Sequence, residues 1–305
     1  MSLDQVSNAM KALYHLTAGN KLKSLIDRKM VKYLDRRAAQ NRRVRGSRMA
    51  IFANEHVGIQ INQYGVYEIQ ELTLLFDFVK PLGDAFAQAT VIDAGANIGN
   101  HSLFFSHHFK QVLAFEPNPT TFSLLKFNTE AVDNIAIVNQ GLGNEPDTLM
   151  LVEDAMNMGA SSIVRKAGAE DRQIPVQIDT LDKATAAIDR IEMIKIDVEG
   201  FEIKVLEGAT ALIERHQPII VFEQHASEFH DGTTASLSFL SKLGYRFCWH
   251  QKGSALGSRA LSKLVDVREY FTGVRHRIVT DEQVPAKNHS MLIAVPTRYH
   301  QALLG

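Results

Sequence analysis

The most informative part of the 305-residue chain is Val91-Ile92-Asp93-Ala94-Gly95-Ala96-Asn97-Ile98-Gly99-Asn100, a short apolar strand followed by a glycine-rich turn and a helix. Gly95 and Gly99 have no Cβ, so a ligand can approach the backbone closely at this turn. The helix that follows leaves free N–H groups at its N-terminus. The stretch therefore predicts a ligand-binding unit of strand, turn and helix.

The same turn argues against a nicotinamide dinucleotide as the ligand. The pyrophosphate fingerprint G-x-G-x-x-G requires glycine at its third and sixth positions, where this chain has Asn97 and Asn100. Asp93 lies beside the place where a phosphate would bind, and a carboxylate suits a cationic or hydroxylated ligand better. An NAD-dependent oxidoreductase is disfavoured and stays an alternative on the same architecture.

A second acid indicates that the ligand contains a ribose. Glu116 stands twenty-one positions after Gly95, at the end of the next predicted strand. An acid at this place in a βαβ unit accepts hydrogen bonds from ribose hydroxyls. A ribose without a pyrophosphate points to S-adenosylmethionine.

Outward from this unit, helices and strands alternate from Leu72 to the end of the chain. Short apolar strands that alternate with helices predict an α/β fold, a doubly wound and mostly parallel sheet with ligands at the carboxyl ends of its strands. The main strands are predicted at 91–93, 111–115, 135–139, 193–197 and 219–223, with a final pair at 245–249 and 291–295. Two extra strands, 148–152 and 174–178, flank a polar insertion.

The region before this alternation is strongly basic. Residues 21–48 contain eleven Lys or Arg against Asp27 and Asp35, with apolar residues at helical spacing. We interpret this segment as a solvated helix that caps the main domain, with a patch for an anionic substrate, a membrane surface or nucleic acid as alternatives. Residues 50–68 are expected to form one or two strands. The predicted division is a 1–70 extension, of helix and strand, and a 71–305 main domain.

Composition narrows the class of protein further. Hydrophobic residues make up 45% of the chain and the net charge is −1, so a disordered chain or a general nucleic-acid binder is not favoured. With Cys248 as the one cysteine, an intramolecular disulfide is excluded. No apolar run approaches the roughly 18 residues of a membrane span, and no secretory signal is visible. We expect a cytoplasmic protein, and leave a homo-oligomer open.

Three motifs stand in order along the chain. They are Gly95-Ala96-Asn97-Ile98-Gly99-Asn100-His101-Ser102, Phe115-Glu116-Pro117-Asn118-Pro119, and Ile194-Lys195-Ile196-Asp197-Val198-Glu199-Gly200-Phe201-Glu202 followed by Val205-Leu206-Glu207-Gly208-Ala209. Together they resemble the motifs of the FkbM family of class I S-adenosylmethionine-dependent methyltransferases. The resemblance covers about 68–249, and implies a Rossmann-like seven-strand sheet and O-methylation of a hydroxyl on a small metabolite or sugar.

The resemblance also implies a set of cofactor-binding residues. The glycine turn and the helix after it contribute Asp93, Gly95, Asn97, Gly99, His101 and Ser102. The ribose acid is Glu116, with Pro117 and Asn118 forming the adenosine wall beside it, and the pair that lines the adenine is Gly141 and Leu142. The acid after the fourth strand is Asp197, and the acid that closes over the cofactor is Glu68.

Methyl transfer to a neutral hydroxyl is helped by a base within hydrogen-bond reach. The candidates are Asp197, Glu199, Glu223 and His225, near the ends of two predicted strands, and His225 has the most suitable ordinary pKa. Glu199 has a competing role in holding the turn before Phe201. The four could also ligate a metal, but no close-spaced ligand signature exists and we predict no metal. A non-catalytic S-adenosylmethionine-binding or RNA-associated module that uses the basic helix is the main alternative.

Overall fold

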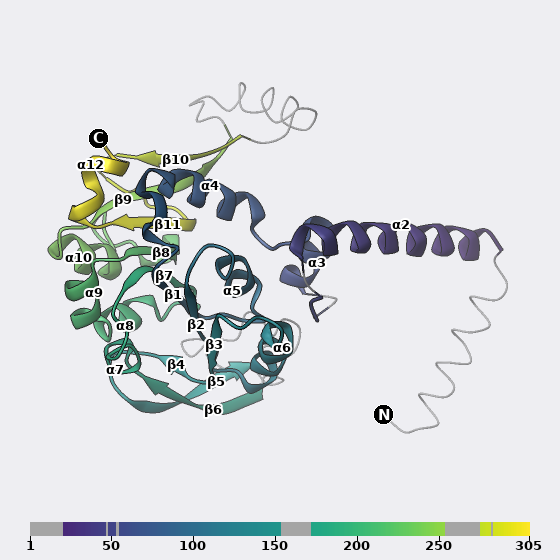
Figure 1. Cartoon of the computed structure of the whole chain (residues 1–305), viewed down its shortest axis with the longest axis horizontal. Helices are drawn as coiled ribbons and strands as arrows, with labels where there is room; N and C mark the ends of the chain where they lie inside the picture. The colour runs from purple at the N-terminus through teal and green to yellow at the C-terminus, as the bar shows by residue number, and fades with distance from the viewer. Residues whose placement is uncertain (1–20, 47, 53–54, 154–171, 254–274, 282) are drawn as a thin grey trace.

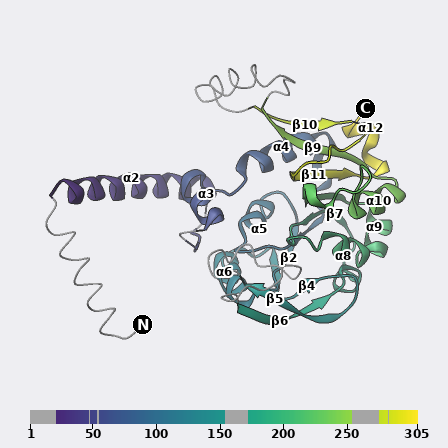
Figure 2. The same ribbon diagram turned by 180° about the vertical axis from the view of Figure 1, so that it is seen from behind.

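The computed structural model describes residues 21–46, 48–52, 55–153, 172–253, 275–281 and 283–305. Most of them form one body around a central sheet, and α2 (Lys21–Arg45) projects from it (Figures 1 and 2). None of the helices in these ranges is long and apolar enough to cross a membrane. The predicted polar insertion lies mostly outside the described residues.

The central sheet has eight strands in the order β10-β9-β11-β8-β7-β1-β2-β3. The five from β8 to β3 are parallel, and β11, β9 and β10 are antiparallel to their neighbours. This confirms the predicted doubly wound α/β fold. The strands are β1 (Thr90–Ala94), β2 (Gln111–Phe115), β3 (Ile135–Val138), β7 (Ile191–Ile196), β8 (Ile219–Gln224), β9 (Arg246–Lys252), β10 (His276–Thr280) and β11 (His289–Val295).

The strand count corrects the expectation of seven, because β10 adds an eighth strand at one edge. β10 pairs with β9 alone, and its residues are exposed or half-buried. Its sequence, His-Arg-Ile-Val-Thr, has no continuous apolar run. Edge strands with little burial leave a weak sequence signal, which is why β10 was missed.

Helices cover both faces of the sheet. Val91 and Ile92, neighbours on β1, belong to two different hydrophobic clusters, as expected when successive side chains point to opposite faces. One cluster includes α4 and α5, and the other includes α8, α9 and α10. The helices of the main body are α4 (Ile69–Val79), α5 (Asn100–Phe105), α6 (Pro119–Thr129), α7 (Leu181–Ala184), α8 (Glu202–Glu207), α9 (Thr210–His216), α10 (Ala235–Lys242) and α12 (His300–Leu303), with 3₁₀ turns η1 (Lys80–Ala85), η3 (Ala226–Glu228) and η4 (Thr297–Tyr299).

The two extra strands form a separate small sheet, as Figure 1 shows below β2 and β3. β5 (Asp147–Glu153) and β6 (Arg172–Asp179) are antiparallel, and β4 (Gly141–Leu142) runs parallel to β6. Leu151, Ile174, Val176 and Ile178 form its core. Both strands were predicted from alternation, and the short β4 was not.

Residues 50–68 differ from the prediction, because α3 (His56–Tyr64) replaces the expected strands. Val57, Ile59 and Ile61 alternate in sequence, but Ile59 is exposed while Gly58 and Ile61 are buried. A Cβ on Gly58 would lie 2.0 Å from the Phe52 carbonyl oxygen, so glycine allows the helix to pack against the preceding chain. Burial every third residue is helical, and it overrides the apparent two-residue period.

The basic helix α2 is present, but it does not cap the main domain. Its main packing partner is α3, where the Asn41 side chain donates a hydrogen bond to the Asn62 carbonyl. Leu25, Ile26, Met30, Val31, Tyr33 and Leu34 are all exposed. Figures 1 and 2 show the helix extending away from the sheet.

Candidate functional site

A cavity of about 650 Å³ lies at the carboxyl ends of β1, β2, β7 and β8. Its roof comes from α3 and the first turns of α4, which the strand prediction for 50–68 missed. Eleven of the sequence-predicted site residues line it: Glu68, Gly95, Asn97, His101, Glu116, Pro117, Gly141, Leu142, Asp197, Glu199 and Glu223. Asp93, Gly99, Ser102, Asn118 and His225 are not among its lining residues.

Gly95 is required by the packing of the turn. Its φ is +81°, and a Cβ would lie 1.8 Å from the carbonyl oxygen of Asp197. Glycine therefore lets β1 end directly against the end of β7. Gly99, also left-handed, packs against Leu125 of α6, since a Cβ there would lie 2.8 Å from that side chain.

Glu116 is a buried carboxylate held by two backbone donors. The N–H of Asn97 donates to Oε2 at 2.9 Å, and the N–H of Asn118 donates to Oε1 at 2.8 Å. Burial raises its pKa to about 7, against the opposing effect of these two hydrogen bonds. The Asn118 side chain accepts from the Thr120 N–H and so caps α6, which fixes the backbone that holds Glu116.

A buried lysine links two predicted acids. Lys195 Nζ lies 3.0 Å from Asp197 Oδ2 and 3.7 Å from Asp93 Oδ1, and Ser102 donates to Asp93 Oδ2 at 2.5 Å. Asp93 and Ser102 therefore lie outside the cavity lining and help to hold Lys195, which in turn contacts Asp197. Lys195 was missed, although a lysine within the apolar strand Ile194-Lys195-Ile196 was a visible signal.

The lysine keeps Asp197 ionised. Burial alone would raise the pKa of Asp197, but the charge and hydrogen bond of Lys195, with smaller contributions from His101 and His225, hold this pKa below its ordinary value. Burial alone would lower the pKa of Lys195, and the carboxylates of Asp197 and Asp93 raise it instead. The pair is therefore a fixed charge couple at the cavity floor.

Further carboxylates surround Asp197. Burial, and then the charge of Asp197, raise the pKa of Glu223 to about 7, and the same two causes raise the pKa of Glu199. The turn before Phe201 is held by Glu202, which accepts from the Gly200 N–H at 3.1 Å. Glu202 therefore shares in the role that was expected of Glu199, and Glu199 also lines the cavity.

The segment before α4 is tied to α5 across the cavity. The Tyr67 N–H donates to Asn100 Oδ1 at 2.9 Å, and Asn100 Nδ2 donates to the Tyr67 carbonyl at 3.1 Å. His101 Nε2 lies 3.3 Å from Glu68 Oε2. Burial and the nearby acids, Glu68 first, raise the pKa of Tyr67. Asn100, which breaks the dinucleotide fingerprint, thus has a structural role of its own.

His225 lies beside the acids rather than in the cavity lining. It precedes η3, and its N–H donates to Glu228 Oε1 at 3.2 Å. Its positive charge, when present, lowers the pKa values of Asp197, Glu199 and Glu223. The structure places Glu223, rather than His225, on the cavity wall.

A mostly parallel sheet with a glycine turn after β1 and a buried acid after β2 defines a Rossmann-like fold. Residues 93–247, just over half of the chain, match the family described as Methyltransferase FkbM domain, and the chain belongs to this family.

Individual relatives match part of the chain. "Methyltransferase sdnD" of Sordaria araneosa is 30% identical over an alignment of 153 residues, and the match covers 39% of this chain and 59% of that protein. "Hexuronic acid methyltransferase AglP" of Haloferax volcanii is 27% identical over 175 residues, covering 57% of this chain and 72% of that protein. The crystal structure of Methyltransferase FkbM from Methylobacillus flagellatus KT has 17% identity and a TM-score of 0.36, covering 68% of this chain and 44% of that one.

Proposed function

We propose that this chain is an O-methyltransferase that moves a methyl group from S-adenosylmethionine to a hydroxyl of a small metabolite or sugar. The observation that carries the proposal is one cavity that combines Glu116, after β2, with the carboxylates around Asp197. Membership of a methyltransferase family supports methyl transfer. The name of the Haloferax relative, a hexuronic acid methyltransferase, supports a sugar acceptor.

The residues of the cavity fit S-adenosylmethionine. Glu116 offers carboxylate oxygens to two ribose hydroxyls, and Pro117, Gly141 and Leu142 offer a mostly apolar wall to the adenine. The ionised Asp197 suits the positive charge of the sulfonium and ammonium groups. When bound, this cofactor supplies a methyl group that the charge on sulfur has already activated.

Glu223 is our candidate for the base that takes the proton of the acceptor hydroxyl. It lines the cavity, and with a pKa of about 7 it is partly ionised near neutral pH and basic enough to accept a proton. Asp197, which Lys195 keeps ionised, is a weaker base. This assignment replaces His225, which does not line the cavity.

The roof contributes positioning. Tyr67 and Glu68 are held to α5 by the hydrogen bonds of Asn100 and the contact with His101. A fixed roof limits the positions open to an acceptor and excludes water from part of the cavity. Alignment of donor and acceptor supplies much of the rate increase in a displacement of this kind.

The acceptor class is tested by transfer of labelled methyl from S-adenosylmethionine to a panel of uronic acids, neutral sugars and RNA. We expect label in a sugar hydroxyl, and its loss in Asp197→Asn. Label in RNA alone would support the RNA-associated alternative. S-adenosylmethionine binding without any transfer would support a non-catalytic binding module.

A further inference from the structure

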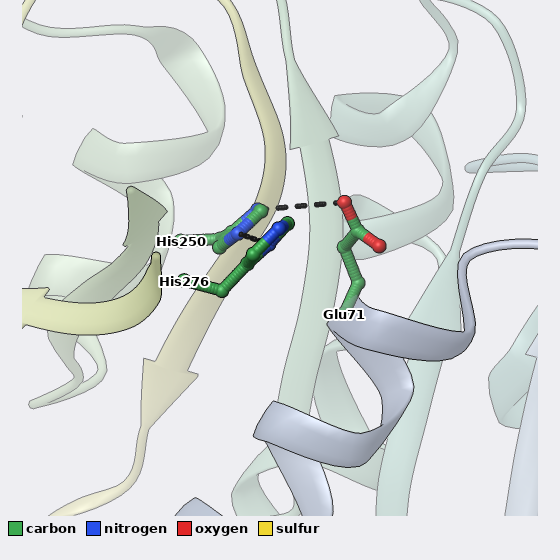
Figure 3. A group of neighbouring side chains, drawn as sticks. All are labelled: Glu71, His250 and His276. Atoms are coloured by element: carbon green, nitrogen blue, oxygen red, sulfur yellow. Dashed lines mark hydrogen bonds and ion pairs between the residues drawn. The ribbon is translucent and has the colours of Figure 1, made fainter. Parts of the chain in front are cut away.

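A second cluster of chemically active side chains, drawn in Figure 3, lies beside the cavity, which Glu71 also lines. Glu71 on α4 points toward His250 on β9, and the His276 ring lies against the His250 ring. His250 Nε2 is 2.9 Å from His276 Nδ1, and His250 Nδ1 is 3.7 Å from Glu71 Oε1. The two imidazole rings are stacked at an interplanar angle of 10°.

Each of these side chains offers one ligand atom, and the three atoms lie within 4.8 Å of one another. Ligand atoms about 2.0–2.2 Å from a tetrahedral zinc ion lie about 3.3–3.6 Å apart. Small side-chain rotations would therefore bring the three atoms into one coordination sphere. Within the described part of the chain, this is the one group of three or more His, Cys, Asp or Glu found to meet that distance condition.

We propose that Glu71, His250 and His276 form a binding site for a divalent transition-metal ion of the zinc class. Two imidazole nitrogens and one carboxylate oxygen suit this class better than they suit Mg²⁺, which prefers oxygen ligands. Three protein ligands leave a fourth position for water or an oxygen of another molecule. The hydrogen bond between the rings places one proton between the facing nitrogens, and a ring nitrogen that ligates the ion must give up any proton that it carries.

The charges around Glu71 allow a metal ion to replace the Lys252 ammonium beside its carboxylate. Glu71 and His250 are both buried, and Lys252 Nζ, 3.1 Å from Glu71 Oε1, provides a positive charge for the carboxylate. The Lys252 side chain is largely exposed, so its ammonium can move into water when an ion takes its place. The buried Glu71 carboxylate then has a positively charged partner both with and without the ion.

The position of the site gives it a consequence for the cavity. Glu71 and Lys252 also line the cavity, and α4 carries part of its roof. An ion shared by α4, β9 and β10 would fasten that roof to the antiparallel edge of the sheet. The proposal does not depend on the proposed methyl transfer, since it rests on a different group of side chains.

The test is a titration of chelator-treated full-length protein with Co²⁺, followed by its visible absorption bands, and with Zn²⁺ in competition. We expect one ion per chain, and affinity at least tenfold lower in His250→Ala, His276→Ala and Glu71→Gln. His107→Ala, which changes an exposed histidine outside the cluster, is the matched control and should bind as wild type does. Mg²⁺ should not displace Co²⁺.

Circular dichroism identifies variants that fail to fold, and Glu71→Gln, which preserves side-chain size, keeps the test valid if a histidine variant is lost. Folded wild-type protein without stoichiometric Co²⁺ binding would overturn the proposal and leave the cluster a hydrogen-bonded clamp. Equal Co²⁺ affinity in wild type and in all three variants would overturn it too. S-adenosylmethionine binding, measured on the same samples, tests the proposed function separately.

Discussion

At the scale of single residues, Glu116 is a site residue whose orientation is closely set by the fold. Two backbone N–H groups hold its carboxylate in a buried position, so its orientation is fixed before any ligand binds. Such fixed geometry favours binding because little side-chain freedom is lost when the ligand arrives. The position of Glu116 was predictable from its spacing to Gly95, whereas its two donors were not.

Replacement of Glu116 by alanine should weaken S-adenosylmethionine binding by about 1.5–3 kcal/mol, the range for hydrogen bonds to a charged group. That loss is roughly ten- to hundredfold in the dissociation constant by isothermal titration calorimetry. Glu145→Ala, at an exposed acid outside the cavity lining, is the control. An unchanged dissociation constant in a folded Glu116→Ala variant would show that the ribose is held elsewhere.

The proposed base role of Glu223 predicts a pH dependence with a definite sign. A base must be deprotonated to act, and its pKa is raised to about 7, so turnover should fall as the pH drops through about 7. Glu223→Gln should lower kcat by roughly 10²–10⁴, and His225→Ala by less than tenfold. The dependence of kcat on pH, measured with labelled cofactor for wild type and for the two variants, tests these expectations. The reverse order of the two variants would return the base role to His225.

Lys195 should matter more to stability than its position in an apolar strand suggests. Lys195→Met leaves Asp93, which is fully buried, without its positive partner, and we expect a loss of about 3–5 kcal/mol in the free energy of unfolding. Urea denaturation measures this loss. Adding Asp93→Asn should recover part of it, since the amide is neutral. A single variant as stable as wild type would show that water or another group compensates Asp93.

At the scale of elements, local signals predicted some segments well and failed for others. α6 begins with Asn118 as N-cap and Pro119 at the first helical position, and both signals are local in sequence. α3 was mistaken for strands because its apolar residues alternate in sequence, whereas its burial, at Gly58 and Ile61, recurs every third residue. The pairs Tyr67–Asn100 and Lys195–Asp93 also join residues far apart in sequence, so no local pattern contains them.

Because α2 projects from the sheet, its charges can be reversed without changing any residue that lines the cavity. Reversal of Lys29, Lys32 and Arg36, all exposed, to glutamate should leave S-adenosylmethionine affinity within about twofold of wild type, because α2 projects from the sheet and salt screens exposed charges. Steady-state kinetics on the same variant test the alternative interpretation. A large rise in KM that depends on added salt would show that α2 attracts an anionic acceptor.

At the scale of the whole molecule, the alternation of apolar strands and helices was enough to predict the mostly parallel sheet and the edge at which the cavity lies. Asp197 and Glu116 come from different strands, and the carboxyl ends of parallel strands bring them to one cavity. Of the roof, the closing segment at Glu68 was expected from the family resemblance, whereas α3 was not, because residues 50–68 were expected to form strands. The strand count differed because β10 lies at the sheet edge with little burial and leaves a weak sequence signal.

Calorimetric titration of the full-length chain with S-adenosylmethionine and, separately, with NAD tests the account most directly. We predict binding of one S-adenosylmethionine per chain and no heat from NAD at millimolar concentration, because the turn at Gly95 lacks the pyrophosphate fingerprint while Glu116 and Asp197 suit a cationic ribose-containing ligand. Comparable heat from NAD, with none from S-adenosylmethionine, would contradict it.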